Sequence, residues 1–181
     1  DPPQGEEKFI KTEGGFEYAD ELVTFIKNNF SFCIGAACYP EGHVECKDLE
    51  RDIENLQRKV DSGVDFLITQ LFFDNRYYFD FLDRAQKKNI NIPVIPGIMP
   101  ILNLKQIQRF TKMCGTHLSE HLMSKFEGVQ DDNEKVRQIG IEHAISQCKE
   151  LLESKAPGIH FYTLNRSKAT FSILEELKEF A

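Results

Sequence analysis

The chain has 181 residues and a formal net charge of −7, because 29 aspartates and glutamates outnumber 22 lysines and arginines. Hydrophobic residues make up 41% of it and aromatic residues 11%, which excludes wholesale disorder, since a disordered chain has low hydrophobicity and few aromatics. The acidic balance argues against a general nucleic-acid binder and against binding to an anionic membrane surface, because both need a basic face. The length suits a single domain over residues 1–181.

No segment of the chain resembles a membrane anchor or a signal peptide. No apolar run approaches the roughly 20 residues that span a bilayer, and the first residues lack the basic and apolar regions of a signal peptide. They also lack an initiator methionine, so we expect a processed or partial chain. The 5 cysteines are odd in number and scattered, which favours reduced thiols and a cytoplasmic location over a disulfide framework.

Helical and strand-like segments alternate along the chain after a predicted loop over residues 1–15. Short apolar segments predict strands, at residues 30–40, 65–73, 93–100 and 158–165. The first two are typical of strands buried on both faces. Helical periodicity and capping residues predict helices, at residues 16–26, 48–63, 75–89, 104–114, 119–126, 131–154 and 168–180. Strands separated by helices indicate parallel pairing, with the helices covering the sheet.

Two α/β architectures fit this alternation, an open doubly wound sheet and part of a (β/α)₈ barrel. A full barrel usually needs roughly 250 residues, so this chain has room for about half of one. Both architectures place their chemistry at the carboxyl ends of the strands. We therefore expect the functional residues at those ends.

Polar side chains occur where three of the predicted strands end. Tyr39 and His43 follow the first strand, and an ordinary turn with a surface histidine is the simpler interpretation. Gln70 lies within the second strand, where its amide would either bond neighbouring backbone or recognise a planar heterocycle. Tyr162 and Arg166 close the last strand, where an arginine could hold a carboxylate or a planar ring.

The predicted helix over residues 48–63 has a polar flank beside its narrow apolar stripe. At about 100° per residue, the flank is formed by Asp52, Asn55, Arg58 and Lys59. A solvated charged face is one interpretation. The other is a ledge that offers a hydroxyl acceptor, an amide and two phosphate donors.

Several common motifs are missing from the sequence. Cys38, His43 and Cys46 match no standard zinc spacing and lack a fourth ligand, so we expect no metal site. Neither GxGxxG nor GxxxxGK[ST], the two standard glycine loops for phosphates, is present, and there is no GxSxG motif.

Four blocks of sequence together resemble the methylenetetrahydrofolate reductase family. They are residues 37–43 (ACYPEGH), 68–74 (ITQLFFD), 96–100 (PGIMP) and 160–166 (HFYTLNR). The resemblance implies a (β/α)₈ barrel that binds FAD noncovalently, of which this chain would supply roughly the last four strand–helix units. It also implies reduction of 5,10-methylenetetrahydrofolate to 5-methyltetrahydrofolate with NADH or NADPH, by ping-pong hydride transfer through the flavin. The cofactor carries such chemistry and the protein positions it.

The resemblance assigns roles to individual residues. FAD contacts are assigned to Glu17, Tyr18, Ala19, Tyr39, His43, Asp52, Asn55, Arg58 and Lys59. Contacts to the folate are assigned to Gln70, Gln106, Phe110, Tyr162 and Arg166. Asp1 and Gln70 are assigned catalytic roles, Asp1 beside the pyrimidine side of the flavin and Gln70 on the pterin and the nicotinamide amide in turn.

The resemblance also implies a catalytic glutamate on a strand that would precede Asp1, and this chain has no counterpart of it. A non-catalytic flavin- or folate-binding barrel fragment is therefore the alternative function. A metabolic barrel with unrelated chemistry is a third hypothesis. We expect a small folate as the partner, no nucleic acid or membrane, and a homo-oligomer.

Overall fold

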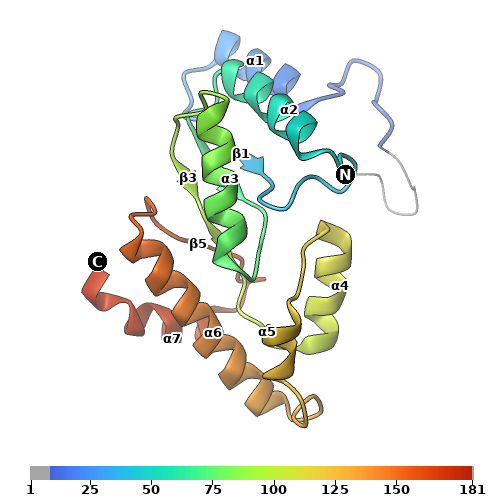
Figure 1. Cartoon of the computed structure of the whole chain (residues 1–181). Helices are drawn as coiled ribbons and strands as arrows, with labels where there is room; N and C mark the ends of the chain where they lie inside the picture. The colour runs from blue at the N-terminus through green and yellow to red at the C-terminus, as the bar shows by residue number, and fades with distance from the viewer. Residues whose placement is uncertain (1–8, 181) are drawn as a thin grey trace.

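The computed structural model describes residues 9–180, which form helices and short parallel strands (Figure 1). The helices are α1 (Ala19–Asn29), α2 (Leu49–Asp61), α3 (Asn75–Lys87), α4 (Leu104–Cys114), α5 (Glu120–Ser124), α6 (Asn133–Glu153), α7 (Ser167–Glu176) and the 3₁₀ helix η1 (Lys178–Phe180). The strands are β1 (Gly35–Cys38), β2 (Phe66–Thr69), β3 (Val94–Ile95), β4 (Gly97–Ile98) and β5 (His160–Phe161). The predicted α/β class is confirmed.

The strands pair in parallel, and neighbours in space follow the order of the chain. β1 pairs with β2 and β2 with β3, while β4 pairs with β5. The carboxyl ends of these strands therefore lie at one edge, as the alternating sequence predicted. No helix in the described part of the chain is long and apolar enough to cross a membrane.

Pro96 divides the predicted strand 93–100 into β3 and β4. A proline has no amide N–H to donate to a strand ladder, so the pairing passes from β2 to β5 at this residue. Thr69 bridges the break, because its Oγ1 accepts the N–H of Gly97 at 2.8 Å and its carbonyl oxygen accepts the Tyr162 hydroxyl at 2.8 Å. A Cβ atom at Gly97 would lie 2.4 Å from that same carbonyl oxygen, which explains the glycine.

The main hydrophobic core lies between the strands and helices α1, α2, α3, α6 and α7. Strand side chains at Cys38, Leu67 and Ile98 point into it and are fully buried. The opposite face of the strands is not covered by other described residues, since Ala37 is exposed and Ile68 is only half-buried. The prediction that the first two strands, at residues 30–40 and 65–73, are buried on both faces was therefore wrong. A second core cluster packs α4 and α5 against the carboxyl edge.

The strands are shorter than predicted, whereas the helices agree with the sequence closely. The first predicted strand began at Phe30, but Phe30 and Phe32 are 51% and 63% exposed, and the pairing with β2 starts only at Gly35. Helix α4 has the predicted bounds, because the Asn103 side chain caps its first turn and Gly115 adopts φ = 69° after its last.

Helix α6 approaches the backbone of residue 101 so closely that only glycine fits. A Cβ atom added at Gly140 would lie 1.8 Å from the Ile101 carbonyl oxygen. Gly→Ala inside a helix normally stabilises by roughly 0.5–1 kcal/mol. Here we expect Gly140→Ala to destabilise by at least about 1–3 kcal/mol, because overpacking against backbone forces the helix away. Thermal melting measures it, with the exposed Ser146→Ala on the same helix as control; a variant as stable as the wild type would contradict the close packing.

Candidate functional site

Two cavities lie at the carboxyl edge of the strands. The larger, of about 670 Å³, lies between the segment that follows β1, helix α2 and the start of α1. Its lining comprises Tyr18, Ala19, Asp20, Cys38, Tyr39, His43, Glu45, Cys46, Lys47, Asp48, Arg51, Asp52, Asn55, Leu56, Arg58 and Lys59. Eight of the nine residues predicted to contact FAD are in this list, and Glu17 is the exception.

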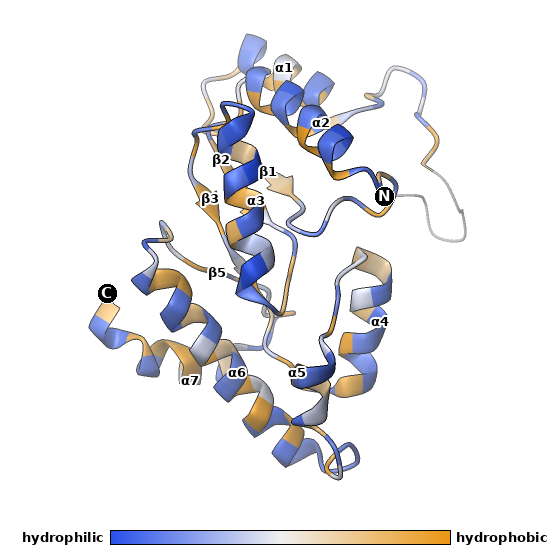
Figure 2. Ribbon diagram, in the orientation of Figure 1, coloured by the Kyte–Doolittle hydropathy of each residue, from blue (hydrophilic) through white to orange (hydrophobic). Residues whose placement is uncertain are grey.

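Helix α2 presents a different chemistry to each side. Ile53 and Leu56 are buried in the core, and hydrophilic residues cover the other side of the helix (Figure 2). Arg51, Asn55 and Arg58, which are spaced by one helical turn, line the cavity. The Arg58 guanidinium donates a hydrogen bond to the Asn55 side-chain oxygen at 2.6 Å. This pairing holds the guanidinium beside the cavity.

Lys59 and Asp52 are the more deeply placed charges of this wall. The Lys59 ammonium donates to the Ala37 carbonyl oxygen at 2.6 Å, which ties α2 to β1. Burial lowers the pKa of Lys59 and raises the pKa of Asp52, because both lose contact with water. Burial also raises the pKa of the Cys38 thiol beside them, so this cysteine is a neutral part of the wall.

The segment after β1 turns sharply and places two rings at the cavity. Gly42 has φ = 90°, and its N–H donates to the Tyr39 carbonyl oxygen at 3.0 Å. The turn brings the Tyr39 and His43 rings into edge-to-face contact, with centroids 4.6 Å apart. Burial raises the pKa of the Tyr39 phenol, which keeps it neutral. The turn interpretation and the binding-site interpretation of this segment are therefore compatible.

Two of the three predicted FAD contacts around the start of α1 line the larger cavity. Tyr18 and Ala19 line the larger cavity. Glu17 does not, and its N–H instead donates to the Glu21 carboxylate at 2.7 Å, at the start of α1. Asp1 lies outside the described residues.

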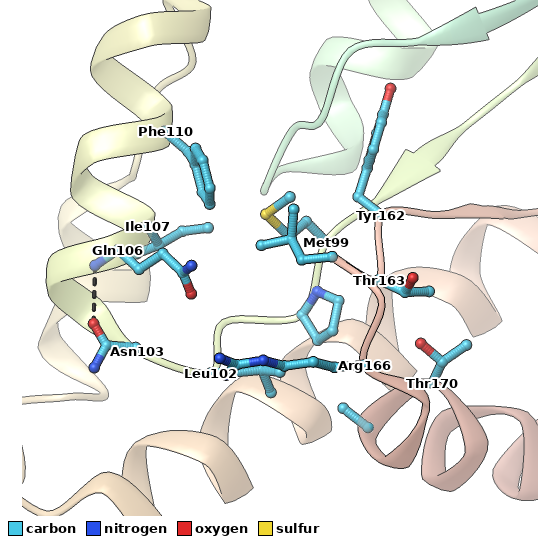
Figure 3. Close-up of a pocket in the computed structure, with 13 residues that line it drawn as sticks. Met99, Leu102, Asn103, Gln106, Ile107, Phe110, Tyr162, Thr163, Arg166 and Thr170 are labelled. Carbon is cyan, nitrogen blue, oxygen red and sulfur yellow. Dashed lines mark hydrogen bonds between the residues drawn. The ribbon is translucent and has the colours of Figure 1, made fainter.

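The second pocket lies between α4 and the end of β5. Its free volume is about 20 Å³, enough for little more than one water. Gln106 and Phe110 extend from α4 on one side, while Tyr162 stands opposite and Arg166 runs across the base (Figure 3). The structure therefore brings together the four predicted folate contacts other than Gln70. The Tyr162 hydroxyl is already engaged with the Thr69 carbonyl oxygen.

Gln70 directly follows β2 and lines neither cavity. Its side-chain oxygen accepts the N–H of Leu71 at 3.0 Å, and the residue is half-buried. Its NH₂ group donates no hydrogen bond to another residue in the range 9–180. Alternation along the strand puts Gln70 on the same open face as Ile68. The oxygen of the amide thus bonds the neighbouring backbone, and its NH₂ group has no partner among the described residues.

The sequence analysis did not single out Lys47 and Arg51, which line the larger cavity, or Glu41, which lies beside it. Lys47 and Arg51 add positive charge to the larger cavity, and the helical spacing of Arg51 with Asn55 and Arg58 could have identified the arginine. Glu41 lies between Tyr39 and His43 in the first sequence block, and its Oε2 accepts the N–H of His117 at 2.8 Å. That contact joins residues 76 apart in the chain, and nothing in the local sequence indicates it.

The structure holds no preformed cluster of metal ligands in the part of the chain that it describes, where no three His, Cys, Asp or Glu side chains gather. The five cysteines are all unpaired.

The fold and these cavities define an α/β protein with two pockets at the carboxyl ends of its parallel strands. The sequence model of the methylenetetrahydrofolate reductase family matches residues 1–178. The 5,10-methylenetetrahydrofolate reductase of Escherichia coli is 39% identical over 160 residues, which is 88% of this chain and 54% of the relative. Methylenetetrahydrofolate reductase 1 of Schizosaccharomyces pombe is 38% identical over 97% of this chain and 29% of its own length. The chain belongs to the methylenetetrahydrofolate reductase family.

Two further comparisons extend this result. Methylenetetrahydrofolate reductase (NADH) 1 of Arabidopsis thaliana is 37% identical over 98% of this chain and 32% of its own length. The chain therefore spans about half the length of its bacterial relative and about a third of its eukaryotic ones. A protein from Clostridium thermocellum that binds two copies of 5-methyl-5,6,7,8-tetrahydrofolic acid has a similar fold, with a TM-score of 0.66 at 17% identity, over 99% of this chain and 66% of that one.

Glu41 makes the stability of the protein depend on pH. Burial raises the pKa of its carboxyl to about 7. The hydrogen bond from the His117 N–H lowers this pKa, and the nearby negative charge of Asp74 raises it. The native state thus favours the protonated carboxyl, and stability from this group is lost as pH rises from about 4.5 through about 7. We expect Glu41→Gln, which cannot ionise, to gain melting temperature relative to wild type between pH 5 and pH 8. A difference that stays constant over this range would contradict the assignment.

Proposed function

We propose that this chain is the flavin- and folate-binding part of an FAD-dependent reductase that converts 5,10-methylenetetrahydrofolate to 5-methyltetrahydrofolate with NADH or NADPH. The observation that carries the proposal is the larger cavity, in which eight of the nine residues that the family resemblance assigned to FAD come together beside α2. Membership of the reductase family supports the same function.

The residues of the larger cavity fit a dinucleotide. Its lining carries four cationic side chains, Lys47, Arg51, Arg58 and Lys59, beside four acidic ones, Asp20, Glu45, Asp48 and Asp52. Two negative charges on a diphosphate would be matched by donors of this kind. Asp52 offers acceptor oxygens to sugar or ribityl hydroxyls, and Tyr39 offers a flat ring. The volume of about 670 Å³ lies within the range of ligand pockets.

When bound, FAD would accept a hydride from the nicotinamide and pass it to the folate, as such cofactors do. The role of this chain is to hold and orient the reacting molecules. We assign the free NH₂ end of Gln70 to the pterin and to the nicotinamide amide in turn, because an amide donor can serve either. Asp1 is assigned to the neighbourhood of the flavin from the family resemblance alone. The proposal takes the general acid from outside these 181 residues.

The second pocket suits the aromatic and anionic parts of a folate. Phe110 from α4 and Tyr162 from the end of β5 face each other across it, and an aromatic ring could stack on Phe110. Gln106 offers an amide on the same side. Arg166 is exposed at the base, where a guanidinium can hold a carboxylate. The small free volume requires α4 or the Tyr162 ring to move when the ligand enters.

We further propose that the strands form part of a (β/α)₈ barrel, of which this chain supplies about four units. Parallel neighbours in chain order and helices packed on one face support this architecture. The outer edges of β1 and β5 pair with no strand within the described residues. The open face around Ile68 is half-buried and apolar, as expected of a surface that faces the interior of a closed barrel.

We also propose an oligomeric state and a cellular location for the whole protein. The rings of Phe16, Phe25, Phe30 and Phe32 contact one another in series and are exposed, which supports a homo-oligomer, since large apolar patches usually mark interfaces. Five unpaired thiols support a cytoplasmic location. Sedimentation of the purified protein measures the first property.

The absorption spectrum of the complete natural protein tests the function directly. We expect a yellow protein that NADH or NADPH bleaches and that regains its colour when methylenetetrahydrofolate is added. A colourless protein that takes up no FAD would overturn the proposal. A yellow protein that the folate cannot reoxidise would favour the non-catalytic binding fragment instead.

Loss of two cations should release the cofactor without unfolding the protein. Each charge-assisted hydrogen bond contributes about 1.5–3 kcal/mol, so we expect Arg58→Ala with Lys59→Ala to weaken FAD retention by at least about tenfold. The melting temperature of the flavin-free protein should change far less. The control removes two exposed cations elsewhere, at Lys87 and Lys112, and should retain FAD. Equal losses of FAD retention and of stability would contradict the role of this pair.

Gln70 is the residue whose removal separates the folate reductase from an unrelated metabolic barrel. A hydrogen bond from its amide to the pterin would contribute about 1 kcal/mol or more. We therefore expect Gln70→Ala to raise the KM for methylenetetrahydrofolate by about fivefold to tenfold, with FAD still bound. Gln86→Ala, on the exposed side of α3, serves as the matched control. Unchanged folate kinetics would favour the unrelated barrel.

A further inference from the structure

The segment between β1 and α2 touches the segment between α4 and α5 at two places. The Oε2 atom of Glu41 accepts the N–H of His117 at 2.8 Å. Beside this bond, a Cβ atom added at Gly115 would lie 2.8 Å from Cγ1 of Val44. The two segments are therefore in van der Waals contact as well as hydrogen-bonded.

These two segments carry the walls of different sites. Tyr39 and His43, on either side of Glu41, line the larger cavity. Helix α4 ends at Gly115 and carries Gln106 and Phe110, which line the second pocket. The bond between Glu41 and His117 is the hydrogen bond that joins these two walls in the described part of the chain. The two walls are thus joined directly by this bond.

The Glu41 carboxyl is unusual because one of its oxygens has no partner. Oε1 is buried and accepts no hydrogen bond from residues 9–180, and a buried unsatisfied polar atom costs free energy. Asp74 and Tyr77, from the start of α3, are titratable groups that interact electrostatically with Glu41, and His117 contacts it through its backbone N–H. The neighbouring Pro40 carbonyl oxygen accepts the Arg84 guanidinium at 2.6 Å, which fixes the backbone before Glu41. Glu41 as a whole is half-buried, and an apolar side chain at this position would avoid the cost of the buried oxygen.

We propose that Glu41 is a positioning residue that couples the two sites, by holding the Tyr39–His43 turn against the end of α4. The proposal rests on the proposed function, since it takes the larger cavity as the flavin site and the second pocket as the folate site. The second pocket must widen to admit a ligand, and α4 is one of its walls. Glu41 sets the position of that wall relative to the flavin side.

Three variants of the complete protein test this role. Glu41→Ala removes the acceptor, whereas Glu41→Gln keeps an oxygen that can accept the N–H of His117. Glu120→Ala removes an exposed acid three residues from His117 that makes no side-chain hydrogen bond to the described residues. The quantities measured are the FAD dissociation constant, the KM for methylenetetrahydrofolate, kcat, and hydrogen–deuterium exchange of residues 115–119 in the ligand-free protein.

We expect Glu41→Ala to weaken FAD binding and to raise the folate KM, each by about tenfold, which is near the upper end of the net value of one hydrogen bond. The kcat at saturating ligands should change less than about twofold, because no reacting group is removed. Exchange of residues 115–119 should accelerate, while the exchange of β1 and β2 stays slow. Glu41→Gln should restore all three quantities, and Glu120→Ala should leave them at the wild-type values.

The outcomes separate this proposal from the proposed function. Faster exchange in Glu41→Ala with no flavin bound by any form, the wild type included, would overturn the reductase function and the coupling with it, and would leave only a contact between two segments. Normal flavin and folate kinetics in Glu41→Ala would overturn the coupling alone. Failure of Glu41→Gln to restore binding would also overturn it, because the accepted hydrogen bond would then not be the cause.

Discussion

A single threonine holds the two parts of the sheet together. Thr69 is fully buried, and it accepts hydrogen bonds from the Gly97 N–H through its side chain and from the Tyr162 hydroxyl through its carbonyl oxygen. These bonds take over where Pro96 interrupts the ladder. The second pocket lies at the edge that this arrangement creates, and the placement of its Tyr162 ring over Gly97 depends on these bonds. An apolar residue of the same size would leave the Gly97 N–H without a partner.

Helix α2 serves the core and the candidate cofactor site at once. Ile53 and Leu56 pack into the core, while Arg51, Asn55 and Arg58 line the cavity one turn apart. The packing of the apolar side fixes the rotation of the helix about its axis. That rotation decides which side chains face the cavity, and the hydrogen bond from Arg58 to Asn55 then holds the guanidinium there.

Local patterns predicted the helices better than the strands. Asn103 and Gly115 mark the ends of α4 in the sequence because caps act within a few residues. The end of a strand is set by its neighbour, which is distant in the chain, so the predicted strand from Phe30 was too long. The polar face of α2 was predictable from its spacing. The contact between Glu41 and His117 was not, since it forms only when the fold brings the segments together.

The two cavities differ in how far apart their walls lie in the chain. Residues 18–59 supply the whole lining of the larger one, whereas residues 99–170 are needed for the second. Contacts between residues near in sequence form with less loss of chain entropy. During synthesis from the amino terminus, the larger cavity can assemble before β5 and α7 leave the ribosome. A cofactor captured at that moment would act as a scaffold on which the later units dock.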